Sequence, residues 1–281
     1  MRAVLSGFLA IAIGCVTTGA ARAALANDGY LTYAGTADAR HASDFLYGER
    51  HFLRYAGGQV AERVVLYTCR NGSAFARKTV SYVDRTAPDF LIENATDGMR
   101  EGIRAAAGGA AVPAGTAAPA SGAGSSRRTV FFRPHGSDPE RAGPVPRVPG
   151  LVADAGFDEF VQMHWQDLMS GHPLEMRFLL PSRLTDYGFQ VEHLRSESVR
   201  GVAAEVFRLR LAGFWGHFLP GIDVYYDAAS HVLVRYDGLS DLRDPAGNNY
   251  KTQIDFPESE RKAATGDALR EARSAPLAPC R

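Results

Sequence analysis

Residues 153–171, ADAGFDEFVQMHWQDLMSG, form the stretch on which the predicted fold depends. Its larger side chains recur at three- and four-residue spacing, which places them along one side of a helix; they are Phe157, Phe160, Val161, His164, Trp165 and Leu168. Asp154 suits the N-cap because its carboxylate can accept from the free amides of the first turn. Gly171, followed by His172 and Pro173, predicts the end of the helix. The sequence therefore predicts one amphipathic helix over 155–170.

Short strands are predicted on both sides of this helix. Turn signals such as Gly57-Gly58 and Asn71-Gly72, between alternating apolar residues, indicate an antiparallel meander over 30–104. After the helix the alternation is cleaner, in 175–180, 189–192, 207–211, 222–226, 232–236 and 250–256. Residues 105–127 are nearly all Ala, Gly, Pro, Ser and Thr. They predict a disordered loop inside one domain, because such a segment has almost nothing to bury.

The number of strands decides the architecture. About ten strands at about 4.8 Å each make a sheet some 50 Å wide, whereas one helix is only about 10–12 Å across. A twisted sheet of that width is expected to curl. We therefore predict a mainly β (β-rich α+β) fold: a curled antiparallel sheet or open barrel of about ten strands with one central amphipathic helix. This single domain spans 24–257, and 258–281 form a charged C-terminal tail.

The first residues predict export. Met1-Arg2 is a basic start, 3–16 are apolar, and Ala21-Arg22-Ala23 fits a cleavage site, so 1–23 are expected to be a signal peptide of a periplasmic protein. Ala12-Ile13-Gly14-Cys15 also resembles a lipobox, and a lipid anchor on Cys15 is the alternative. Without residues 1–23 the chain carries 29 basic and 31 acidic residues, which argues against a nucleic-acid partner.

Two cysteines, Cys69 and Cys280, remain after such processing. Export favours a disulfide between them. The alternative is a buried apolar Cys69 and a free thiol at Cys280. The sequence leaves both alternatives open.

Few sequence motifs indicate a metal site, a nucleotide site or a catalytic site. No histidine spacing suits zinc, and the chain has no P-loop, no Rossmann glycine pattern and no Gly-x-Ser-x-Gly elbow. We therefore expect no cofactor, no metal and no catalytic residue. His164, with Asp167 close behind, is better explained as a hydrogen-bonded core histidine. If the protein is an enzyme, His164, Asp167 and Cys69 are the candidates.

The order of elements across most of the mature chain resembles the half-barrel carriers of the lipoprotein-localisation type (LolA and LolB). These are exported proteins with a curved antiparallel sheet whose concave side is covered by helices. The stretches YTCRNGSAFARK (67–78) and VYYDAASHVLVRYDGLSDLRD (224–244) also look like those of uncharacterised bacterial secreted proteins.

A curled sheet lined by aromatic side chains can hold an apolar ligand. We therefore expect a non-catalytic exported protein that binds or carries an apolar or lipid-like molecule. The predicted ligand-binding residues are Phe157, Phe160, His164, Trp165, Phe207 and Leu209. Two alternatives stay open: a structural component of the cell envelope with a filled core, and an enzyme of unknown class that uses the same cavity.

Overall fold

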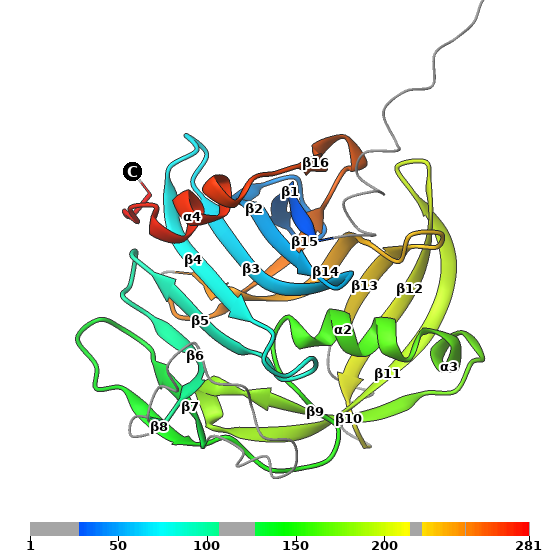
Figure 1. The fold of residues 1–281 in the computed structure, drawn as a ribbon, viewed down its shortest axis with the longest axis horizontal. Coiled ribbons are helices and arrows are strands. Elements are labelled where there is room, and N and C mark those ends of the chain that lie inside the picture. Colours follow the sequence, from blue (N-terminus) through cyan, green and yellow to red (C-terminus); the bar gives the residue numbers. More distant parts are fainter. Residues whose placement is uncertain (1–27, 107–126, 214–220, 245, 281) are drawn as a thin grey trace, which may run out of the picture.

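One curved sheet organises the molecule in the computed structural model, which describes residues 28–106, 127–213, 221–244 and 246–280 (Figure 1). Sixteen strands of the described residues join in the order β8-β7-β6-β5-β4-β3-β2-β1-β15-β14-β13-β12-β11-β10-β9, with β16 beside β1. Neighbours are antiparallel, apart from the short parallel pair of β9 and β10. We call β1 to β8 the first half and β9 to β15 the second half.

The strands have the following bounds: β1 Gly29–Ala39, β2 Phe45–Ala56, β3 Gln59–Thr68, β4 Ala74–Ser81, β5 Asp89–Asn94, β6 Arg100–Ala105, β7 Arg128–Arg133, β8 Arg141–Pro144, β9 Leu151–Val152, β10 Leu174–Leu180, β11 Thr185–Val199, β12 Val202–Leu211, β13 Ile222–Asp227, β14 Leu233–Arg243, β15 Asn249–Asp255 and β16 Lys262–Ala263. The helices are α2 Gly156–Met163, α3 Trp165–Met169 and α4 Gly266–Ser274, and the 3-10 turns are η1 Pro181–Arg183 and η3 Glu258–Glu260.

The sheet curls without closing, so the predicted mainly β fold with an open, curved antiparallel sheet is confirmed. Its two ends meet through side chains: Phe132 of β7 packs in one apolar cluster with Leu179 of β10. The Arg141 guanidinium of β8 also donates to the Ser182 carbonyl of η1 over 2.9 Å. The strand number exceeds the predicted ten. Short strands such as β8, β9 and β16 carry no alternation that would indicate them.

Inward-facing residues of the first half fall into cross-strand rows. One row runs through Leu31, Leu53, Arg63, Val80 and Phe90. The next runs through Tyr33, His51, Val65, Lys78, Ile92 and Glu101. Each row therefore sets charged groups among apolar ones on the concave face.

The concave side is covered by α2 and α3, which stand between the two halves of the sheet (Figure 1); we call residues 156–169 the helical cover. The prediction of one continuous helix over 155–170 is corrected, because the helix is interrupted at His164, whose φ and ψ are −108° and 18°. At the interruption the His164 ring contacts the Phe160 ring, with the two planes tilted by 44°, and the neighbouring Trp165 stacks on His231. Gly171 has the predicted left-handed backbone, with φ of 86°.

Asp154 does not cap the helix, so that prediction was wrong. The N-cap is Ala155, which has no side-chain cap hydrogen bond. Asp154 has φ of 45°, and its carboxylate lies 2.5 Å from Lys78 Nζ. The ion pair with the lysine from β4 uses Oδ1 of Asp154, and Oδ2 is buried without a hydrogen-bond partner among the described residues.

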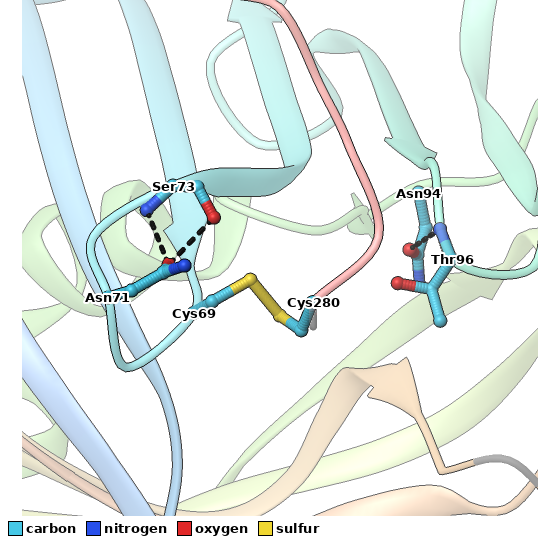
Figure 2. Close-up of a disulfide and its surroundings, with 6 residues drawn as sticks. All are labelled: Cys69, Asn71, Ser73, Asn94, Thr96 and Cys280. Atoms are coloured by element: carbon cyan, nitrogen blue, oxygen red, sulfur yellow. Dashed lines mark hydrogen bonds between the residues drawn. A yellow bond between two sulfur atoms is a disulfide. The ribbon is translucent and has the colours of Figure 1, made fainter.

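The C-terminal residues, expected as a charged tail, pack on the outer face of the first half. Leu269 and Ala272 of α4 are buried against Val64 of β3. The Ala278 amide donates to the Ala74 carbonyl over 3.0 Å. The structure pairs Cys69 with Cys280, with Cα atoms 5.5 Å apart (Figure 2). The C-terminal segment that follows α4 is thus covalently joined to the end of β3.

Several predictions concern residues outside the described ranges. The signal peptide over 1–23, the lipid anchor on Cys15 and most of the loop at 105–127 belong to them. The described part of that loop continues the hairpin of β6 and β7, since the Ala106 amide donates to the Arg127 carbonyl. Within the described ranges, no helix combines the length and the apolar character that a membrane span requires.

Candidate functional site

The space between the helical cover and the second half is occupied by the residues predicted to bind a ligand. Phe157, Phe160, Trp165, Phe207 and Leu209 all belong to one buried cluster, with each residue at most 8% exposed. The sixth, His164, lies at the rim with 38% of its side chain exposed. The structure therefore brings five of the six predicted residues together at one place.

Aromatic rings fill this space; we call Phe157, Phe160, Trp165, Phe207 and Tyr226 the aromatic cluster. Trp165 lies 5.0 Å from Phe207 between ring centroids and stacks on His231 at 3.7 Å. Phe207 lies 6.0 Å from Tyr226. With the cover in place, these rings pack against one another as in a protein core.

A buried ion pair fastens α2 to the first half. Arg63 Nη1 of β3 donates to Asp158 Oδ2 over 2.9 Å, and the Tyr226 hydroxyl of β13 donates to Asp158 Oδ1 over 2.9 Å. The carboxylate from α2 is thus held by donors from both halves of the sheet. Burial lowers the pKa of the Arg63 guanidinium, but the opposing charges of Tyr82, Tyr33 and Asp158 outweigh it and hold that pKa above its usual value.

A second ion pair holds the chain just before α2. Lys78 Nζ lies 2.5 Å from Asp154 Oδ1 and 2.7 Å from Asp241 Oδ2. Burial lowers the pKa of Lys78, whereas the two carboxylates raise it by more, so the ammonium stays charged. Lys78 and Asp154 are almost fully buried, but Asp241 is 44% exposed. This charged group therefore reaches from the interior to the surface.

Two further titratable groups lie in the same row as Lys78. Burial, together with the nearby carboxylate of Asp241, raises the pKa of Glu101 to about 8. Burial lowers the pKa of His51, although a hydrogen bond to Glu49 over 2.8 Å opposes the shift. These groups make the concave face of the first half polar at its centre, while the second half presents aromatic rings.

Sequence reasoning missed this polar half of the site. Arg63, Lys78 and Glu101 each share strand parity with buried apolar neighbours, as Lys78 does with Val80. A lone charge at an inward position of an alternating strand was the available signal, because burial of a charge requires a partner. The partners Asp154 and Asp158 could not be paired with them from sequence distance.

Of the residues considered for catalysis, two lie on the helical cover and one follows β3. His164 Nδ1 and Asp167 Oδ2 are 3.4 Å apart, and the Asp167 side chain is 68% exposed. Cys69 is bonded to Cys280, so it offers no thiol nucleophile in this state.

The surface also has an open depression of about 470 Å³ beside the disulfide. It is lined by Phe45, Leu46, Cys69, Arg70, Asn71 and Cys280. The Arg70 guanidinium lies 4.6 Å from the Phe45 ring centre, and Asn71 accepts from the Ser73 hydroxyl (Figure 2). None of the predicted ligand residues under the helical cover lines this depression.

Comparisons with known proteins give likenesses in fold. No protein-family model matches the chain, and no curated protein is similar to it in sequence. A solved β-barrel-like protein of the domain of unknown function DUF1849 from Brucella abortus shares 8% identity over 85% of this chain and 98% of its own, with a TM-score of 0.43.

Two other solved structures match at a TM-score of 0.30 and 9% identity. A DUF1329 family protein from Desulfovibrio piger covers 89% of this chain and 92% of its own. A putative outer membrane lipoprotein-sorting protein domain from Vibrio parahaemolyticus covers 87% of this chain and 89% of its own. A putative lipoprotein-sorting domain, the type that the order of elements resembles, is thus among the solved structures to which the chain is similar.

Proposed function

We propose that this is an exported, non-catalytic protein of the bacterial periplasm that carries an apolar or lipid-like molecule inside its curled sheet, beneath the helical cover. The observation that carries the proposal is the aromatic cluster, which lies between a wide curved sheet and two short helices. Aromatic and aliphatic walls of this kind suit an apolar ligand. The disulfide between Cys69 and Cys280 agrees with an oxidising compartment.

The helical cover is attached to the sheet by side-chain contacts that a ligand can replace. Side chains hold α2 and α3 to the sheet; the ion pair Arg63–Asp158 is one of these attachments, and Lys78–Asp154 holds the chain just before α2. Lifting of the cover separates Asp158 from Arg63, so opening requires a ligand that compensates the buried charge left behind. When the cover lifts, a ligand chain takes the place of the cover's aromatic rings against Phe207 and its neighbours.

A direct binding measurement tests this function. A fluorescent fatty-acid analogue should bind saturably to the full chain and should be displaced by an envelope lipid extract. The absence of saturable binding would contradict the proposal.

The sheet offers a matched pair of variants for this assay. Val224 faces the helical cover, whereas Val206 belongs to the apolar cluster of the outer face, and both are buried. Val224→Ala and Val206→Ala should lower stability similarly, since each removes the same two methyl groups from a packed site. Only Val224→Ala should weaken binding of the analogue. Equal affinities in the two variants would place the ligand elsewhere.

A filled interior favours a second candidate, a structural envelope component. The close packing of Trp165 on Phe207 and His231 is the specific observation for it. This candidate predicts the same loss of stability in the two valine variants and no saturable binding in the wild type.

A further inference from the structure

Asp158 occupies a buried site built for an anion. Its two carboxylate oxygens accept from Arg63 Nη1 and from the Tyr226 hydroxyl, both over 2.9 Å. Arg63 and Tyr226 lie on strands β3 and β13, in different halves of the sheet, whereas Asp158 lies on the helical cover. We call Arg63, Tyr226 and Tyr82 the anion cradle. The two strand-borne donors would remain in place if α2 moved away.

The cradle holds more donors than Asp158 uses. Arg63 is 8% exposed, and its Nε is buried without a hydrogen-bond partner among the described residues. The Tyr82 hydroxyl is likewise buried and unpartnered in the described structure. A guanidinium offers five donors in a planar fork that fits two oxygens of one anion side by side. Asp158 therefore satisfies only part of what this site can give.

Tyr82 is placed to act together with Arg63. Arg63 lies opposite Val80, and Tyr82 follows two residues later on the same face, which is the diagonal position on neighbouring strands. Burial raises the pKa of Tyr82 and the charge of Arg63 opposes that rise. The phenol thus lies within electrostatic reach of the guanidinium.

Lys78 provides the contrast. Two carboxylates, those of Asp154 and Asp241, contact its ammonium. The charge of Lys78 is therefore already neutralised, and a third anion would be repelled. Of these two buried cations, Arg63 is the one with a buried donor atom that has no hydrogen-bond partner among the described residues.

We propose that the anion cradle binds the headgroup of the carried ligand, and that the ligand is an amphiphile with a carboxylate or phosphate headgroup. This inference rests on the proposed carrier function. In the covered state the Asp158 carboxylate stands in for that headgroup. When α2 lifts, Asp158 leaves with it, and the ligand anion pairs with Arg63, which would otherwise be an uncompensated buried charge.

The cradle adjoins the apolar part of the site, which gives the ligand its orientation. Tyr226 belongs both to the cradle and to the buried cluster that contains Phe207 and Val224. A headgroup at Arg63 therefore leaves the hydrocarbon chain against the second half of the sheet. The polar headgroup of the ligand thus matches the polar first half of the concave face, and its hydrocarbon chain matches the aromatic second half.

Three probes of equal chain length test the headgroup: hexadecanoate, hexadecyl phosphate and hexadecanol. We expect at least one anionic probe to bind the wild type about tenfold or more tightly than the alcohol, as a desolvated, bidentate charge pair allows. The stronger of the two anions identifies the source as a carboxylate or a phosphate lipid. Equal binding of all three would overturn the headgroup proposal and leave the carrier function standing. Binding of none would overturn the carrier function itself.

Variants assign the effect to the cradle. Arg63→Met should abolish the preference for anionic probes, while hexadecanol should still bind. The control is Arg208→Met, which breaks a pair with Asp223 on the outer face and should leave the preference for anionic probes unchanged. Tyr82→Phe removes an unpartnered hydroxyl, so it should weaken anion binding severalfold without lowering the melting temperature; Tyr250→Phe is its control. Asp158→Asn removes the internal competitor and should tighten anion binding. If Arg63→Met does not fold, Tyr82→Phe and Asp158→Asn decide, and unchanged anion affinity in both would overturn the proposal.

Discussion

At the scale of single residues, the interior differs from the apolar core that alternation predicts. The parity of β3, β4 and β6 places Arg63, Lys78 and Glu101 inward, and each is at most 9% exposed. Arg63 and Lys78 have carboxylate partners from the chain around α2. Glu101 has no cationic side chain at hydrogen-bond distance among the described contacts, and its buried environment favours the neutral acid.

Glu101 should make the stability of the protein depend on pH. Its pKa is about 8 in the folded protein against an ordinary value of 4.5. Between these values the folded state keeps a proton that the unfolded state loses, so the free energy of unfolding falls as pH rises from 4.5 to 8. Urea unfolding across this range should show a slope of up to about 1.4 kcal/mol per pH unit from this group. Glu101→Gln should flatten the profile, whereas Glu175→Gln, at an exposed position, should not change it.

At the scale of elements, much of the sheet is readable from sequence and the contacts of the cover are not. The Gly57-Gly58 and Asn71-Gly72 turns mark the hairpins of β2 with β3 and β3 with β4, since these residues suit the required backbone. The strands β9 and β16 have two residues each, too few for any period. Asp154 is of a residue type that often caps helices, but its Oδ1 is paired with Lys78, which lies far away in sequence.

The entry of α2 depends on a close approach that only glycine permits. A Cβ at Gly156 would lie 1.9 Å from the carbonyl oxygen of Thr86. Gly156→Ala should therefore lower the free energy of unfolding by about 1–3 kcal/mol through overpacking and should shift α2 away from the loop before β5. Gln162→Ala, exposed on the same helix, is the control. Unchanged stability in Gly156→Ala would mean that the cover is not seated on this loop.

Trp165 anchors the cover on the second half. It is 7% exposed and contacts the rings of Phe207 and His231. Trp165→Ala should therefore lower the free energy of unfolding by about 3–5 kcal/mol, as large truncations in packed cores do. A loss below about 1 kcal/mol, the range of exposed positions, would show that the ring is not packed in the covered state.

At the scale of the whole molecule, one disulfide ties the end of the chain back to its first half. Cys69 and Cys280 are separated by 211 residues, and no local pattern relates them, so the sequence could not decide whether they pair. The segment between β15 and Cys280 brings α4 across the outer face of β2 and β3. Burial of Leu269 and Ala272 there explains why the segment is not a solvated tail.

Removal of this disulfide should weaken the whole domain. Cys69→Ser with Cys280→Ser should lower the free energy of unfolding by about 2–5 kcal/mol, because a long closed loop constrains the unfolded chain most. Thermal unfolding of the reduced wild type should match that of the double variant. Equal stability of the oxidised and reduced proteins would contradict a stabilising role for the disulfide.

The central claim is that the helical cover lifts to admit an amphiphile, and a spin-label distance measurement tests it most directly. Val83, after β4, and Met163, on α2, are 68% and 62% exposed, so Val83→Cys and Met163→Cys can be labelled with the native disulfide intact. The distance distribution between the two labels should shift to longer values when the protein is saturated with hexadecanoate. An unchanged distribution in the saturated protein, or no binding of hexadecanoate or hexadecyl phosphate, would contradict the account.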